Sequence, residues 1–336
     1  MQHRRAEKKR LQAPVPTTTV VVGCLQNWTR HAIPEARRQT RRGPAGRGFT
    51  RGEWKDNMGL WDSGESLETI GQQLREEGYA VVPQLLSSAE VDALEEECSR
   101  LVEVAAEQCH ADPRDGEWAA RERGCIFQPL PVAQAEPSAP AAAFRTDARA
   151  YGTARATRPC SPAARDILLG ARMAELVGAV LGRPAYLYND QYIVKPARSS
   201  LASFRWHRDS DWCRSGQFTY APYISVWCAL DDMTLGNGTL VVAPRGGAWS
   251  AQPSGAPAGG PSLAGNGGGD PGLRPLAVRA GDAVVMDDMV WHASGPNGSA
   301  FARRAWMPQF SAGPICHTGS GQPVSLAVPL VSGGGA

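Results

Sequence analysis

The chain has 336 residues and is 42% hydrophobic, which is enough to build a sizeable core in one large domain or two. No apolar run approaches the roughly 20 residues of a membrane span, and eight cysteines without a paired C-x-x-C spacing exclude a zinc knuckle and argue against a disulfide framework. The formal net charge is only +2, so the chain as a whole lacks the strongly basic balance of a nucleic-acid-binding protein.

The positive charge is concentrated at the N-terminus. Residues 1–50 carry eleven Lys and Arg and two Glu, a net charge of +9, so the rest of the chain carries −7. We therefore expect residues 1–62 to be a disordered basic segment separate from the folded body. Its Arg-rich, acid-poor composition is typical of an organelle transit peptide, for a chloroplast or a mitochondrion, but a disordered tail of a cytosolic protein fits it equally well. The unpaired cysteines favour an intracellular protein in either case.

A single folded domain is expected over residues 63–315, and it begins with helices. Ser87 and Glu90 form a capping box in front of a helical pattern of apolar residues. Ser161 is a typical helix N-cap and Gly182 a typical helix end. The expected elements are a helix over 66–77, a strand over 78–83, a helix from residue 88, irregular structure over 110–160 and a helix over 161–182.

From residue 186 the pattern changes to short runs rich in β-branched and aromatic residues, broken by Gly, Pro and Asp. Many short strands after a helical beginning predict a mainly β fold with flanking helices, a β-sandwich or jelly roll. Residues 246–275 include 15 Gly and Pro in 30 positions and predict a flexible insertion. Residues 316–336 are expected to form a C-terminal tail. The predicted strands cover 186–194, 204–212, 223–230, 239–243, 277–279, 283–286 and 304–310.

Three residues in this strand-rich region predict a metal site. His207 and Asp209 are two positions apart, so both would point to the same face of the predicted strand, and His292 follows 85 positions later. Two imidazoles and one carboxylate are the ligands of non-haem Fe(II) oxygenases. An H-x-D triplet alone occurs often by chance, but histidine is scarce here, with six in the chain, and both His207 and His292 follow a Trp.

Several motifs occur in a consistent order around these residues. Together they resemble the phytanoyl-CoA dioxygenase family of Fe(II)/2-oxoglutarate oxygenases, over roughly residues 66–312, although no single motif is specific. The loop from Pro244 departs from the family pattern, so substrate contacts cannot be transferred. The motifs are Gly78–Pro83, Val194–Pro196, Trp206–Asp209, Val226–Asp232, Asn237–Leu240, Ala280–Asp282 and His292–Asn297, which leads to Arg303 and Arg304.

The resemblance implies a double-stranded β-helix, a cupin-like jelly roll, with iron held by His207, Asp209 and His292. It places Arg303, eleven positions after His292, at the far carboxylate of the co-substrate 2-oxoglutarate, with O2 as the second co-substrate. A guanidinium suits that role because it forks two N–H donors onto a carboxylate. Further co-substrate contacts are implied for Gln191, Lys195, Trp227 and Ser294, although Trp227 could equally be a core aromatic residue and Ser294 a turn serine.

The implied activity is a hydroxylation of a small molecule or acyl conjugate, with retained Asp209 favouring hydroxylation over the halogenation of relatives that lack this carboxylate. Two alternatives stay open. One is a non-catalytic jelly-roll binding protein that retains the metal site, and the other is a metal-independent sandwich in which the three ligands lie far apart. The sequence identifies neither the substrate nor the oligomeric state.

Overall fold

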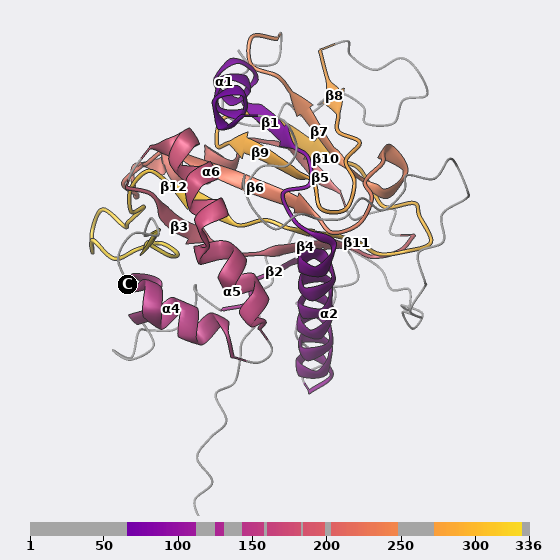
Figure 1. The fold of residues 1–336 in the computed structure, drawn as a ribbon, viewed down its shortest axis with the longest axis horizontal. Coiled ribbons are helices and arrows are strands. Elements are labelled where there is room, and N and C mark those ends of the chain that lie inside the picture. The colour runs from indigo at the N-terminus through magenta and orange to yellow at the C-terminus, as the bar shows by residue number, and fades with distance from the viewer. Residues whose placement is uncertain are drawn as a thin grey trace, which may run out of the picture.

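The computed structural model describes the chain in segments that together form one body (Figure 1). Predictions for residues 1–62 and for most of the 246–275 insertion lie outside the described residues. Within the described part, no helix combines the length and apolarity needed to cross a membrane. The described residues are 66–111, 125–130, 143–157, 160–182, 184–198, 203–247 and 272–330.

Two antiparallel sheets form the centre of the molecule. The larger has the order β13-β3-β12-β6-β11-β4-β2, with β9 also pairing with β6 and β1 pairing with β9. The smaller has the order β5-β10-β7-β8. Strands of the larger sheet are β1 (Tyr79–Val82), β2 (Cys125–Phe127), β3 (Tyr186–Asn189), β4 (Tyr192–Lys195), β6 (Tyr223–Ala229), β9 (Ala283–Asp287), β11 (Arg303–Trp306), β12 (Gln309–Ser311) and β13 (Val328–Pro329). Strands of the smaller sheet are β5 (Phe204–His207), β7 (Leu240–Ala243), β8 (Arg274–Pro275) and β10 (Trp291–Ser294).

Strand β6 divides its side chains between two cores. Val226 and Cys228 belong to a cluster that includes residues of the helices, whereas Trp227 and Ala229 belong to a second cluster that includes Val242 of the smaller sheet. Because successive side chains of a strand point to opposite faces, the larger sheet packs against helices on one face and against the smaller sheet on the other. This arrangement of two facing antiparallel sheets is the jelly roll, or double-stranded β-helix, that the sequence predicts.

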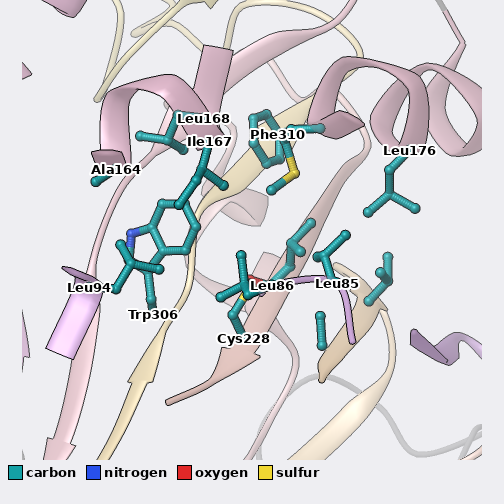
Figure 2. Packing of buried hydrophobic residues seen from close by; sticks show 14 of the residues in the cluster. Leu85, Leu86, Leu94, Ala164, Ile167, Leu168, Leu176, Cys228, Trp306 and Phe310 are labelled. Atoms are coloured by element: carbon teal, nitrogen blue, oxygen red, sulfur yellow. The ribbon is translucent and has the colours of Figure 1, made fainter. Parts of the chain in front are cut away.

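Helices cover the outer face of the larger sheet. In Figure 2, Leu94 of α2 and Ile167 of α5 lie beside Trp306 of β11, and Leu176 of α6 lies on the other side of the same cluster, beyond Phe310. Figure 1 shows α5 and α6 in front of this sheet. The helices are α1 (Leu67–Glu77), α2 (Ser88–Ala111), α4 (Ala148–Arg155), α5 (Pro162–Leu169) and α6 (Ala171–Leu181), and the 3-10 helices are η1 (Ala143–Arg145), η2 (Asp209–Ser215) and η3 (Leu235–Asn237).

The single helix predicted over 161–182 is wrong, because the chain breaks it into α5 and α6 at Gly170. The backbone of Gly170 is extended, with φ −75° and ψ 162°. A Cβ at this position would lie 2.4 Å from the carbonyl oxygen of Asp166, so only glycine allows this close approach. Apolar periodicity continues through the break, which is why the sequence pattern does not reveal it.

Other differences concern element ends. The predicted strand over 186–194 is two strands, and the one over 204–212 ends at His207, where η2 follows after one residue. Residues 277–279 form no strand, and 110–160 contains α4 and β2 where irregular structure was expected. The segment expected as a C-terminal tail contributes β13, which pairs with β3.

A buried ion-pair cluster fastens the helices to the larger sheet. The Arg155 guanidinium of α4 donates to both Glu97 oxygens of α2, at 2.7 and 2.5 Å, and to Asp190 Oδ2, at 2.6 Å. Tyr192 donates to Glu97 and Trp306 donates to Asp190. Asp190 lies in the turn between β3 and β4, so the cluster holds this turn against α2 and α4.

Replacing Arg155 with methionine is expected to destabilise the protein by about 3–5 kcal/mol, because it leaves two buried carboxylates without the cation that pairs with both. Urea unfolding measures the change. Arg165→Met is the matched control, because Arg165 pairs with Asp166 and both side chains are more than a third exposed, so its loss should cost only about 0–1 kcal/mol. Equal unfolding midpoints for the two variants would contradict the structural role of Arg155.

Candidate metal centre

Three side chains from two segments that are about 85 residues apart in the chain lie close together. His207 ends β5 and pairs with His292 of β10 in the smaller sheet, and their rings lie 4.2 Å apart. Asp209 begins η2, and its Oδ1 is 3.7 Å from His207 Nε2 and 3.5 Å from His292 Nε2. One ligand atom from each residue lies within 4.8 Å of the other two. The prediction that these three residues form one cluster therefore agrees with the geometry.

Backbone carbonyls orient both imidazoles toward the cluster. His207 Nδ1 is 2.7 Å from the Arg205 carbonyl oxygen, and His292 Nδ1 is 3.1 Å from that of Val290. A carbonyl oxygen can only accept, so each Nδ1 carries the hydrogen and each Nε2 keeps its lone pair. Nε2 is the atom that faces Asp209 in both residues. Both histidines thus present the tautomer that a metal requires.

The electrostatics favour a cation among the three residues. Burial alone would raise the pKa of Asp209, but His292 and His207 outweigh it and hold this pKa below its ordinary value. Burial would likewise lower the pKa of His292, but Asp209 raises it above its ordinary value. The negative charge of Asp209 therefore favours a positive charge beside His292 Nε2, and a bound metal ion would supply it.

The donor set fits Fe(II). Two neutral imidazoles and one carboxylate can occupy three positions of an octahedral ion and leave three positions for other ligands. His292 has 5% of its side-chain surface exposed and Asp209 has 10%, whereas His207 keeps 39%. Of these three side chains, that of His207 is therefore the most exposed to solvent.

Arg303 places unsatisfied hydrogen-bond donors inside the jelly roll. It lies on β11, is 1% exposed, and stands 5.5 Å from the ring of Trp227. Its Nη2 donates to the Gly238 carbonyl at 2.8 Å, but its Nε and Nη1 have no partner among the described residues. Burial lowers the pKa of Arg303 to about 9, which still leaves it charged at neutral pH. A buried charged donor without a partner lowers stability by roughly 1–3 kcal/mol or more. An anionic acceptor bound at Arg303 would remove this cost.

Lys195 is a second buried basic residue beside Arg303. The two residues are direct partners across β4 and β11, and Lys195 Nζ donates to Ser294 Oγ at 2.7 Å and to the Gly295 carbonyl. Burial and the charge of Arg303 lower the pKa of Lys195 to about 5. Within the described segments, no carboxylate pairs with Lys195 or Arg303. A dicarboxylate would therefore meet two buried basic groups and no opposing acid there.

The other predicted co-substrate residues lie on the same inner surface. Trp227 faces Arg303, and Ser294 contacts Lys195. Gln191 is 6% exposed, and its side-chain oxygen accepts a hydrogen bond from Asn189 at 2.9 Å, so its described partner is neither Arg303 nor Lys195.

Two residues next to the metal ligands are absent from the sequence prediction. Ser225 Oγ donates to Asp209 Oδ2 at 2.5 Å, and Gln309 Nε2 lies 3.3 Å from the same oxygen. A polar residue between apolar neighbours in a buried strand is the sequence feature that could have indicated such a residue. Ser225, which lies between Ile224 and Val226, shows this feature.

Comparison with known proteins identifies relatives of this chain. The family model for phytanoyl-CoA dioxygenase (PhyH) matches residues 74–305. The dioxygenase af480 of Aspergillus fumigatus (strain ATCC MYA-4609 / CBS 101355 / FGSC A1100 / Af293) is 27% identical over 238 residues, which are 69% of this chain and 62% of that protein. The match thus spans less than two thirds of the length of this curated relative.

Two solved structures illustrate the structural likeness. The non-haem α-ketoglutarate-dependent epimerase SnoN from nogalamycin biosynthesis is 18% identical, with a TM-score of 0.48, over 79% of this chain and 93% of SnoN. EctD from S. alaskensis, solved with 2-oxoglutarate and 5-hydroxyectoine, is 19% identical, with a TM-score of 0.48, over 77% of this chain and 78% of EctD. Because the family model matches more than half of the chain, this protein belongs to the phytanoyl-CoA dioxygenase (PhyH) family.

Proposed function

We propose that this protein is an Fe(II)- and 2-oxoglutarate-dependent dioxygenase that hydroxylates a small molecule or acyl conjugate. The observation that carries the proposal is the placement of two complementary subsites along the inner face of β6. Ser225 on this face contacts the metal ligand Asp209, and Trp227, two residues further, lies beside the buried Arg303. A cation site and an anion site are therefore neighbours, as a chelating dicarboxylate requires.

The residues have distinct roles in this proposal. His207, Asp209 and His292 would hold the iron, and Arg303 would receive the far carboxylate of 2-oxoglutarate on its two free N–H groups. Lys195, whose pKa burial lowers to about 5 in the protein alone, would add a hydrogen-bond-donating amine beside it. Bound Fe(II) supplies the chemistry with O2 in which 2-oxoglutarate is converted to succinate and CO2 while the substrate gains one oxygen atom.

Family membership and the relative named as a dioxygenase support an oxygenase activity. Substrate access is proposed from the side of His207, whose side chain is 39% exposed whereas those of Asp209 and His292 are at most 10% exposed. Asp209 leaves no room for a halide in its own ligand position, which supports hydroxylation as the outcome.

The purified protein with Fe(II), 2-oxoglutarate and O2 is expected to release succinate slowly even without its substrate. Treatment with a chelator should reduce the release to the protein-free background, and added Fe(II) should restore it. Added Zn(II) should not restore succinate release, because it binds the same ligands but has no redox chemistry. Mass spectrometry of succinate measures each step.

The alternative binding protein predicts a different result. It would bind Fe(II) and 2-oxoglutarate in calorimetric titrations, but succinate would stay at background under every metal condition. That result would contradict the proposed dioxygenase and leave a jelly roll that binds without turnover.

A further inference from the structure

The two carboxylate oxygens of Asp209 have different surroundings. Oδ1 faces the Nε2 atoms of His207 and His292. Oδ2 faces away from them and accepts hydrogen bonds from Ser225 Oγ at 2.5 Å and Gln309 Nε2 at 3.3 Å. Gln309 Nε2 also donates to Ser225 Oγ at 2.8 Å. One oxygen is therefore directed to the metal position and the other is held by the protein.

The two donors are held by the larger sheet. Ser225 of β6 and Gln309 of β12 are direct partners across an antiparallel pair, so both point to the same face. Ser225 is fully buried and Gln309 is 6% exposed. The Tyr223 hydroxyl, two residues before Ser225, donates to the Asp209 carbonyl oxygen and holds the backbone of the same residue. Side chain and main chain of Asp209 are thus fixed from one strand.

The hydrogen bonds continue away from the metal position in a single direction. Gln128 donates to Asn189 at 2.8 Å, Asn189 donates to Gln309 at 3.0 Å, Gln309 donates to Ser225, and Ser225 donates to Asp209. An ionised carboxylate can only accept, so Asp209 determines the direction of every bond in this chain. Bonds aligned in this way polarise and strengthen each other.

We infer that Ser225 and Gln309 are positioning residues that limit Asp209 to one metal-bonding oxygen. This inference rests on the proposed iron site. A carboxylate free to rotate could bring both oxygens to the ion and take up one of the positions that co-substrate and O2 require. Because Ser225 and Gln309 hold Oδ2, only Oδ1 is available. Three positions then stay open.

Cobalt(II) in place of iron tests the inference without turnover. Ser225→Ala is expected to weaken Co(II) binding by about 10–100-fold, measured by calorimetry, since the loss of partners that orient a ligand has effects of this size. It should also change the visible absorption bands of the Co(II) protein, which report coordination number and geometry. Ser225→Thr keeps the hydroxyl and should restore both properties.

Ser311→Ala is the matched control. Ser311 lies two residues after Gln309 on β12, is 1% exposed, and its hydroxyl has no partner among the described residues. The same substitution there should leave Co(II) affinity and absorption unchanged. A general effect of removing a buried serine would instead appear in both variants, which would overturn the positioning role.

Gln309→Leu provides a second test if Ser225→Ala folds poorly. It removes the donor to Oδ2 and to Ser225, and the absorption bands should again change. Wild-type affinity and spectrum in both Gln309→Leu and Ser225→Ala would overturn the inference while the iron site stands. Failure of the wild-type protein to bind Co(II) would overturn the proposed function together with the inference.

Discussion

Replacing Asp209 with alanine is expected to lower Fe(II)-supported succinate release by more than about 100-fold, because loss of a ligand should exceed the 10–100-fold effects of losing its partners. Asp209 is the one carboxylate of the described metal cluster, so the variant would offer the ion two neutral imidazoles and no negative charge. The variant also leaves Ser225 and Gln309 without their acceptor. Succinate is measured at saturating 2-oxoglutarate, with Fe(II) affinity from calorimetry.

Asp211→Asn is the control for this variant, because an amide oxygen at this position can still accept from the Arg208 backbone N–H that closes the turn. Asp211 lies in the same 3-10 helix, but its carboxylate pairs with Arg208 and is not among the three converging ligands. Most of the succinate release should therefore remain. Equal release from Asp209→Ala and the wild-type protein would remove Asp209 from the ligand set.

The Asp209 position illustrates what sequence could and could not predict. The H-x-D pattern predicts that His207 and Asp209 share a site, on the argument that both lie in one strand. The strand in fact ends at His207, and Asp209 begins η2. Polar residues are the cause, because Asp211 bonds the backbone N–H and the guanidinium of Arg208 and closes a turn there. The predicted proximity agrees with the structure although the predicted backbone is wrong.

The sequence could not predict which residues are partners across neighbouring strands. The pairs Ser225–Gln309 and Lys195–Arg303 depend on the strand orders β6-β12 and β4-β11, which join segments 84 and 108 residues apart in the chain. The alternation of side chains along a strand predicts which face of the sheet a residue occupies, but not which residue lies beside it on the neighbouring strand. The jelly roll itself was predictable because many short strands after helices allow few architectures. The hydrogen bonds around Asp209 could not be predicted in the same way, because they depend on the strand register.

Arg303→Ala is expected to weaken 2-oxoglutarate binding by roughly 100-fold while metal affinity stays at the wild-type value. Truncating one partner of a buried, hydrogen-bonded charge pair costs about 2–5 kcal/mol, and 1.4 kcal/mol is about tenfold in affinity. Arg303 is 1% exposed, and its Nε and Nη1 have no partner among the described residues. In the alanine variant, the carboxylate of 2-oxoglutarate would therefore be buried without its two hydrogen-bond donors. Calorimetry with 2-oxoglutarate and with Co(II) measures the two affinities separately.

Arg304→Ala controls for the loss of an arginine in the same strand. Arg304 points to the opposite face and pairs with Asp231 at 2.7 Å and Glu95 of α2 at 3.4 Å, so its removal should lower stability but leave 2-oxoglutarate affinity unchanged. Arg303→Lys separates charge from geometry, since lysine keeps the charge and loses the two-donor fork. Equal 2-oxoglutarate affinity in Arg303→Ala and Arg304→Ala would remove Arg303 from the co-substrate site. In that case the neighbouring Lys195 would be the remaining candidate for the carboxylate.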